Sequence, residues 1–121
     1  MSATSAWRPA PSALSDRELK QLCRAFGDVT RMRIARHLAH EKEVSVSDLA
    51  ALLVLSQPLA SWHIRILKRA GILLTRRDGR QVYCSLDPRR VAQFQEAIGD
   101  LIRLQPGKED VWEKSALPSS A

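Results

Sequence analysis

Residues 56–86, which read SQPLASWHIRILKRAGILLTRRDGRQVYCSL, decide the fold. Apolar residues recur at helical spacing over positions 57–70, and the glycine that follows commonly ends a helix because it tolerates a left-handed backbone. Two β-rich runs come next, at 72–77 and 81–86. The Asp78-Gly79 pair between them is a strong signal for a tight turn. The stretch therefore predicts one helix followed by a two-stranded antiparallel hairpin.

Positive charge is concentrated in the same part of the chain. The positions from Ser56 to Arg90 hold eight Lys and Arg residues against two Asp, so their net charge equals the +6 of all 121 residues. The remaining residues together are neutral. Such a concentration of cations is typical of a surface that binds a polyanion, and nucleic acid is the most common one.

Three further helices are predicted upstream by their capping residues. Ser15 is a suitable N-cap for one helix and Asp28 for a second. Val44–Val46 is short and β-branched and predicts a strand. Ser45, within this segment, is a suitable N-cap for a third, short helix. This helix ends only a few residues before the one over 57–70, so the two form a helix-turn-helix. The apolar positions expected to face the core are Leu19, Leu22, Cys23, Phe26, Met32, Ile34, Ala35, Leu38, Leu49, Ala50, Leu52 and Leu53.

A last helix opens at Asp87-Pro88, where Asp is the N-cap and Pro takes the first helical position. Its apolar stripe is wider than one small domain needs, which favours self-association. The predicted fold class is mainly α with a small antiparallel β-hairpin: a winged helix-turn-helix domain over residues 15–104. We expect a disordered N-terminal tail over 1–14 and a C-terminal tail over 105–121. The stripe consists of Val91, Phe94, Ile98, Leu101, Ile102 and Leu104.

Length and composition exclude several classes of protein. A chain of 121 residues with 45% hydrophobic and 26% charged residues is typical of one globular domain. No apolar run approaches the roughly 18–20 residues that cross a bilayer. Residues 2–13 lack the basic-then-apolar order of a secretion signal. The sequence therefore predicts a cytoplasmic protein without a membrane partner.

The helix over 57–70 has an apolar and a polar stripe. Ala60, Ile64 and Leu67 recur on the side expected to face the core. The opposite stripe has amide, hydroxyl and cationic groups and no acid, which suits the major groove of DNA, where Gln and Arg make bidentate contacts to base edges. Trp62 flanks this stripe and could stack on a sugar or a thymine methyl, or cover the turn. The polar stripe consists of Gln57, Ser61, Arg65 and Lys68.

The hairpin turn carries Arg76, Arg77 and Arg80, with only Asp78 to offset their charge. Unpaired arginines on a turn repel one another, whereas a narrow minor groove attracts them through its negative potential. We therefore expect all three to contact the DNA backbone or the minor groove beside the recognition helix.

Three segments resemble the ArsR/SmtB family of winged-helix bacterial repressors. They are AFGDVTRMRI at 25–34, SQPLASWHI at 56–64, and residues 67–71 with the hairpin that ends at Val82-Tyr83. The pattern S-Q-x-x-x-S-x-H in the second segment is the most diagnostic. The resemblance implies a dimer formed mainly by the first and last helices, with candidate interface residues Leu19, Leu22, Phe94, Ile98, Leu101 and Ile102. It also implies DNA contacts at Ser56, Gln57, Ser61 and His63. The full set of candidate DNA-binding residues is Ser56, Gln57, Pro58, Ser61, Trp62, His63, Arg65, Lys68, Arg76, Arg77 and Arg80.

The chain departs from the metal-sensing members of that family. Those members use a Cys-x-Cys-like motif on the helix before the recognition helix, or His and carboxylates on the last helix. Here residues 44–48 read VSVSD, without a thiol, and the last helix offers only Glu96 and Asp100. His37 and His40 lack a suitably spaced third ligand and fit a solvated helix face. Neither standard metal site is therefore expected, and no cofactor is.

Cys23 and Cys84 match no metal-binding or redox spacing. Cys23 falls on the apolar face of the first helix, and Cys84 shares a face with Val82 and Leu86 on the second strand. Apolar neighbours raise the pKa of a thiol and reduce its reactivity. Both cysteines are therefore predicted to belong to the core, with a thiol-based redox switch as the alternative.

These patterns predict a sequence-specific transcriptional regulator. A homodimeric repressor would place two recognition helices in successive major grooves of a two-fold symmetric, double-stranded operator, until a signal such as a small-molecule effector releases it. One alternative is a winged-helix protein–protein interaction module, whose hairpin arginines dock on an acidic partner. An enzyme is the weakest alternative, because no nucleophile–base pair is visible. Ser61 and His63, two apart on a helix, point in different directions.

Overall fold

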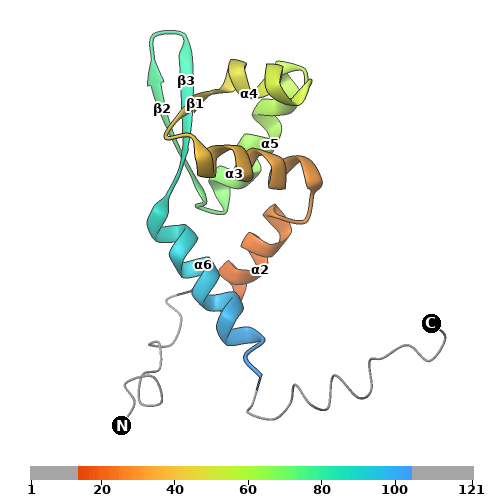
Figure 1. The fold of residues 1–121 in the computed structure, drawn as a ribbon, viewed down its shortest axis with the longest axis vertical. Helices are drawn as coiled ribbons and strands as arrows, with labels where there is room; N and C mark the ends of the chain where they lie inside the picture. The colour runs from red at the N-terminus through yellow and green to blue at the C-terminus, as the bar shows by residue number, and fades with distance from the viewer. Residues whose placement is uncertain (1–13, 105–121) are drawn as a thin grey trace, which may run out of the picture.

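The computed structural model describes residues 14–104 (Figure 1). The hairpin of β2 and β3 stands at one end of the domain with the helix-turn-helix beside it, and α2 and α6 lie at the other end. This order confirms the predicted winged helix-turn-helix fold class. The helices are α2 (Asp16–Ala25), α3 (Val29–His40), α4 (Val46–Leu53), α5 (Gln57–Arg69) and α6 (Pro88–Leu101), and the strands are β1 (Val44–Ser45), β2 (Leu73–Asp78) and β3 (Gln81–Leu86).

The helix starts are fixed by the predicted caps. The Ser15 hydroxyl accepts from the backbone N–H of Glu18, whose carboxylate accepts from the N–H of Ser15, both at 3.1 Å. The Asp28 carboxylate accepts from the second and third N–H groups of α3. Ser45 caps α4 in the same way. Each cap satisfies N–H groups that the first turn of a helix leaves without a partner.

The three strands form one antiparallel sheet in the order β1-β3-β2. The strand over Val44–Val46 was predicted correctly except at its end, because Val46 is the first residue of α4. Asp78 pairs with Gln81, so the turn consists of Gly79 and Arg80. Gly79 has a φ of 64°, which a residue with a side chain adopts only with strain. The hairpin of β2 and β3 (residues 73–86) is called the wing below.

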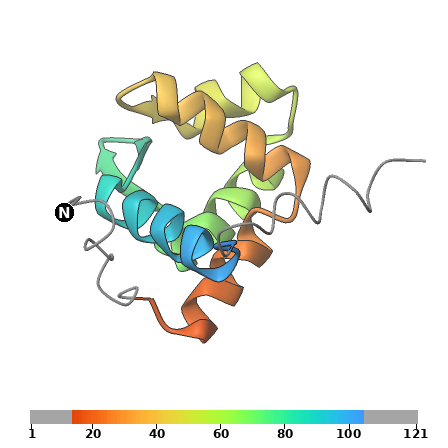
Figure 2. The same ribbon diagram turned by 60° about the horizontal axis from the view of Figure 1, so that its bottom comes forward.

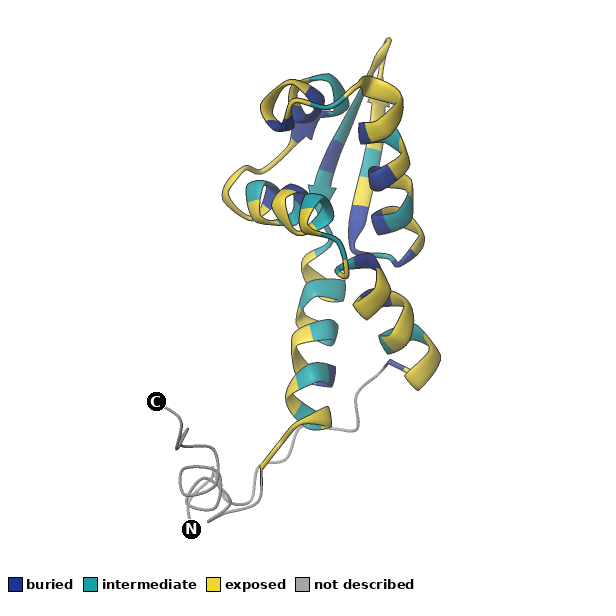
Figure 3. Cartoon of the chain, turned by 90° about the vertical axis from the view of Figure 1, so that its right-hand side faces the viewer, coloured by how far each residue is buried: buried dark blue, intermediate teal, exposed yellow. Residues whose placement is uncertain are grey.

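The core lies where α3, α4 and α5 meet the sheet, and it continues to the buried residues of α2 and α6 (Figure 3). Three positions assigned to it from the sequence lie at the surface: Met32 is 41% exposed, Leu52 is 52% exposed, and Cys23 is exposed. The reason is that each helix buries a narrow stripe. In α3 this stripe is Ile34 and Leu38, and Met32 lies about 200° around the helix from Ile34.

The C-terminal end of α5 is hydrogen-bonded to α2 and α6. Arg90 of α6 donates to the Ala70 carbonyl at 3.3 Å and to the Glu18 carboxylate of α2 at 3.0 Å. Gln21 of α2 donates to the Arg69 carbonyl at 3.3 Å. A Cβ added to Gly71, which has a φ of +86°, would lie 2.8 Å from Nε of Arg90. Figure 2 shows α6 running from the base of the wing toward α2.

The predicted tails fall almost entirely on residues 1–13 and 105–121, which lie outside the described range. Leu14, which we assigned to the N-terminal tail, is 8% exposed and belongs to the core. Within residues 14–104, no single helix is long and apolar enough to cross a membrane. Only α4 and α5 taken together reach that length and hydropathy, and they meet at an angle of 111°.

Candidate nucleic-acid interface

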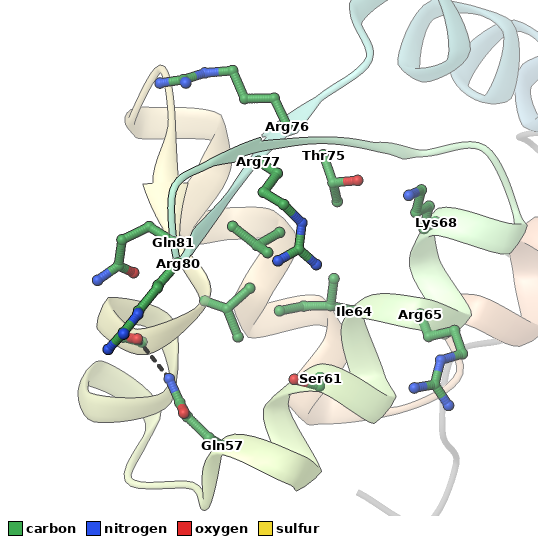
Figure 4. Close-up of a pocket in the computed structure, with 13 residues that line it drawn as sticks. Gln57, Ser61, Ile64, Arg65, Lys68, Thr75, Arg76, Arg77, Arg80 and Gln81 are labelled. Atoms are coloured by element: carbon green, nitrogen blue, oxygen red, sulfur yellow. Dashed lines mark hydrogen bonds between the residues drawn. The ribbon is translucent and has the colours of Figure 1, made fainter.

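A depression of about 700 Å³ separates α5 from the wing (Figure 4). Its cationic side chains come from two segments: Arg65 and Lys68 from α5, and Arg76, Arg77 and Arg80 from the wing. Among the described residues that line it there is no Asp or Glu. The depression is therefore a site of positive potential. Its other lining residues are Val46, Ser47, Gln57, Ser61, Ile64, Thr75, Gln81 and Val82.

Helix α5 has the two predicted faces. Ala60 and Leu67 are fully buried and Ile64 is 5% exposed, so this stripe belongs to the core. Gln57, Arg65 and Lys68 are exposed and Ser61 is half-buried. All four residues of the polar stripe line the depression. A helix with this division presents amide, hydroxyl and cationic groups along one exposed face, as direct reading of base edges requires.

The wing arginines differ from one another in their surroundings. Arg77 points into the depression, toward α5, whereas Arg76 points away from it (Figure 4). Arg76 donates two hydrogen bonds of 2.8 Å to the Glu43 carboxylate, and its guanidinium lies 4.7 Å from the centre of the Tyr83 ring. The expectation that only Asp78 offsets the wing arginines is therefore wrong. Glu43 neutralises Arg76, whereas Arg77 and Arg80 line the depression without an ion pair among those found in residues 14–104.

The pKa values of this pair follow from its geometry. The hydrogen bonds from Arg76 lower the pKa of the Glu43 carboxyl below its ordinary value, and the same hydrogen bonds raise the pKa of Arg76. Both side chains are partly exposed, so solvent screens the attraction. The pair nevertheless joins β2 to the segment before β1.

The N-terminal end of α5 combines capping and exposed polar groups. Ser56 is the N-cap, and its hydroxyl accepts from the backbone N–H of Leu59 at 3.2 Å. Gln57 and Pro58 occupy the first turn and are exposed. The Gln57 side chain donates to the Ser47 hydroxyl of α4 at 2.5 Å. The sequence patterns missed Ser47, because its ten-residue distance from Gln57 fits no helical spacing.

His63 does not reach the surface of the protomer. It is 6% exposed, and its Nδ1 lies 3.1 Å from the guanidinium of Arg31 on α3. This corrects the expectation that His63 contacts DNA: its ring points inward, and its contact with Arg31 positions α5 on α3. Trp62 is 50% exposed, and the Arg31 guanidinium lies 5.8 Å from the centre of its ring. The lining of the depression includes neither residue.

The two cysteines lie in different environments. Cys84 is fully buried in the centre of the sheet, and this burial raises the pKa of its thiol to about 11. Cys23 lies on the exposed side of α2, next to the buried Leu22. The prediction of a core position is therefore confirmed for Cys84 and wrong for Cys23. Among residues 14–104, no three His, Cys, Asp or Glu side chains are close enough to hold a metal ion.

The candidate dimer residues divide into three groups. Leu22 is fully buried inside the protomer, so its assignment to a dimer interface is wrong: α2 turns this residue toward the core. Leu19, Phe94 and Ile98 are half-buried, and the ring of Phe94 stacks on that of Phe26 at 5.3 Å. At the end of α6, Leu101 and Ile102 are 65% and 66% exposed.

Comparisons with known proteins agree on one family. Residues 26–76 match the model of a helix-turn-helix domain. A cadmium resistance transcriptional regulatory protein CadC homolog from Staphylococcus aureus is 39% identical over 79 residues, 65% of each chain. The arsenical resistance operon repressor of Escherichia coli is 34% identical over 88 residues, which cover 73% of this chain and 75% of the repressor. A crystal structure of a possible transcriptional regulator for arsenical resistance is 33% identical with a TM-score of 0.64, and covers 77% of this chain and 94% of the other.

The extent of these matches differs between relatives. The chain spans 65% of the Staphylococcus aureus protein and 58% of an arsenic resistance transcriptional regulator from Pseudomonas putida, in each case less than two thirds. It spans three quarters of the Escherichia coli repressor, and the match to the crystal structure takes in most of the domain described above. On the strength of these matches and of its helix-turn-helix and wing, the chain belongs to the ArsR/SmtB family of winged helix-turn-helix transcriptional regulators.

Proposed function

We propose that the protein is a homodimeric transcriptional repressor that recognises a two-fold symmetric DNA operator. The observation that carries this proposal is the acid-free depression between α5 and the wing. Arg65 and Lys68 lie on one side of it, and Arg77 and Arg80 on the other. A phosphate backbone that follows the depression would meet cations on both sides, while the exposed face of α5 enters the major groove.

The residues of the site have different roles in this proposal. Gln57 and Arg65 read base edges, because amide and guanidinium groups form bidentate contacts with adenine and guanine. Lys68, Arg77 and Arg80 neutralise phosphates. Arg76 holds the wing in place through Glu43 rather than contacting DNA.

A dimer supplies the second recognition helix. The end of α6 exposes three large apolar side chains, Leu101, Ile102 and Leu104, which are 61–66% exposed in the protomer. Association through α2 and α6 would cover them. A winged helix-turn-helix domain from Mycobacterium bovis with the same fold is described as homodimeric. Two copies related by a two-fold axis match an operator with two-fold symmetry.

A mobility-shift titration tests the proposal. The protein should bind a duplex from its own promoter more tightly than a random duplex of equal length, and affinity should fall steeply with salt because phosphate contacts release counterions. Gln57→Ala and Arg65→Ala should reduce the preference for the promoter. Sedimentation should give twice the protomer mass. Equal affinity for both duplexes would contradict sequence-specific repression.

The releasing signal is addressed by repeating the titration with candidate effectors. Several relatives are named for cadmium or arsenic resistance. Residues 14–104 of this chain bring no three metal-ligating side chains together. We therefore propose that the effector is not a metal ion held by a single domain. Release by a thiol oxidant or an organic molecule, and none by cadmium or arsenite, is the expected outcome.

A further inference from the structure

A hydrogen bond joins the two helices of the helix-turn-helix at one end of the depression. Nε2 of Gln57, the first residue of α5, donates to Oγ of Ser47 in the first turn of α4 at 2.5 Å. The dashed line in Figure 4 marks this bond. Both residues line the depression.

We propose that Ser47 is a positioning residue that sets sequence specificity: its hydroxyl holds the Gln57 amide in one orientation, in which the amide reads an adenine in each operator half-site. This inference rests on the proposed function and extends it to a residue of α4 and to the identity of one base.

The chemistry of the amide leads to adenine. An amide nitrogen carries two N–H groups, so the bond to Ser47 leaves one N–H and the carbonyl oxygen of Gln57 available. Together they form a donor beside an acceptor. In the major groove, adenine presents the complementary pair, with N7 as acceptor and the N6 amino group as donor.

The hydrogen bond also lowers the cost of recognition. An exposed glutamine occupies several rotamers and loses this freedom when it binds a base. Gln57 is exposed. Its bond to Ser47 restricts the rotamers before DNA binds, so less side-chain entropy is lost on binding. More of the interaction energy between Gln57 and the base then remains to discriminate between bases.

Ser47 is not needed to build α4. The N-cap of this helix is Ser45, whose hydroxyl accepts from the Asp48 N–H at 3.0 Å. Removing the Ser47 hydroxyl should therefore leave the helix intact. Ser85 on β3, which pairs with Leu74 in the sheet, provides a matched serine away from the depression.

The test compares wild type with Ser47→Ala, Ser47→Thr, Gln57→Ala, the Ser47→Ala/Gln57→Ala double variant and Ser85→Ala. Each protein selects duplexes from a random pool, and its dissociation constants are then measured for the wild-type consensus and for the same duplex with single base pairs changed. Circular dichroism melting confirms that each variant is folded.

The wild type should prefer adenine at one position of each half-site. Ser47→Ala should reduce that preference by about 3- to 10-fold and leave other positions unchanged. Ser47→Thr, which keeps a hydroxyl, should retain the preference, and Ser85→Ala should resemble wild type. In the Gln57→Ala background, Ser47→Ala should have no further effect, because it acts through the missing amide.

Four results would overturn the inference. Ser47→Ala could leave the consensus unchanged, or it could weaken binding to consensus and random duplexes equally. Its effect could persist undiminished in the Gln57→Ala background, or Gln57→Ala could relax a position that prefers a base other than adenine. These are separable from failure of the proposed function. A wild type that selects no consensus contradicts the repressor, whereas a consensus that Ser47→Ala leaves unchanged contradicts only the role of Ser47.

Discussion

Arg90 donates to the Glu18 carboxylate at 3.0 Å across 72 positions of the sequence, and so joins α6 to α2. The same guanidinium donates to the Ala70 carbonyl at the end of α5. The helices expected to form the dimer and the helix expected to read DNA therefore meet at one side chain.

Arg90→Ala should lower Tm, because it removes hydrogen bonds to Ala70, Gln93 and Glu18 together. We expect a decrease of about 4–8 °C, the shift that the loss of about 1 kcal/mol produces in a small domain. Glu18→Gln should have a smaller effect, since Arg90 keeps its carbonyl partner. Thermal melting followed by circular dichroism gives both values, and a larger loss in Glu18→Gln would contradict this account.

Stability should fall at acidic pH. The Ser15 backbone N–H, the Arg90 side chain and the Ser15 hydroxyl lower the pKa of Glu18 below its ordinary value of 4.5, and hydrogen bonds from Arg76 lower that of Glu43. A carboxyl group whose pKa is lower in the folded state stabilises that state above pH 4.5 and loses this contribution as the pH falls through the folded value. Tm measured from pH 7 to pH 3 should decrease below about pH 4.5. Glu18→Gln and Glu43→Gln should each flatten the decrease.

Val54→Gly should stabilise the protein. Val54 ends α4 in the left-handed region, with φ 56° and ψ 52°, and is 89% exposed. This conformation costs an L-residue roughly 1–2 kcal/mol, and glycine removes that strain. Glycine also has more conformational freedom in the unfolded state, which offsets part of the gain in folding free energy. The free energy of unfolding should rise by about 0.5–1 kcal/mol in a denaturant titration. Val54→Ala keeps a Cβ and should gain less, so an equal gain would assign the effect to the exposed side chain instead.

Arg80→Ala should weaken DNA binding about equally for all sequences. The slope of log affinity against log salt should fall by about 1, as expected for one lost phosphate contact. The Arg76→Ala/Glu43→Gln double variant removes an opposite pair of charges and leaves the net charge unchanged. Because we propose that Arg76 positions the wing and does not contact DNA, this double variant should keep the wild-type slope of log affinity against log salt.

Cys84 should be unreactive in the folded protein. At pH 8 its thiol is protonated, because burial raises the pKa to about 11. A Cys23→Ser variant should show almost no reaction with a disulfide reagent until denaturant is added. Retained DNA binding of that variant after peroxide treatment is also expected, whereas loss of binding would show that Cys84 is oxidised and would contradict this prediction.

The features that the sequence predicted well are local ones. Ser15, Asp28 and Ser45 cap helices through N–H groups two or three positions away, and the Gly79 turn joins adjacent strands. The faces of α5 were also predicted, because a core stripe repeats within one helix.

The features that it missed depend on contacts between distant segments. Glu43 and Arg76 are 33 positions apart, and Arg31 and His63 are 32 apart. Periodicity indicates that a helix has an apolar side but does not give the width of the buried stripe, which is why Met32 and Cys23 were placed in the core. His63 was assigned to DNA through its motif, although its ring faces α3.

The close approach of Arg90 to Gly71 has a consequence for the natural variation of this sequence. Any side chain at position 71 would begin 2.8 Å from the guanidinium and would require a positive φ. Substitutions at these two positions should therefore tend to occur together in evolution: a chain that loses the glycine has to move the arginine side chain or replace it with a shorter residue. An alignment in which the two columns vary independently would show that other chains close the end of the recognition helix by a different contact.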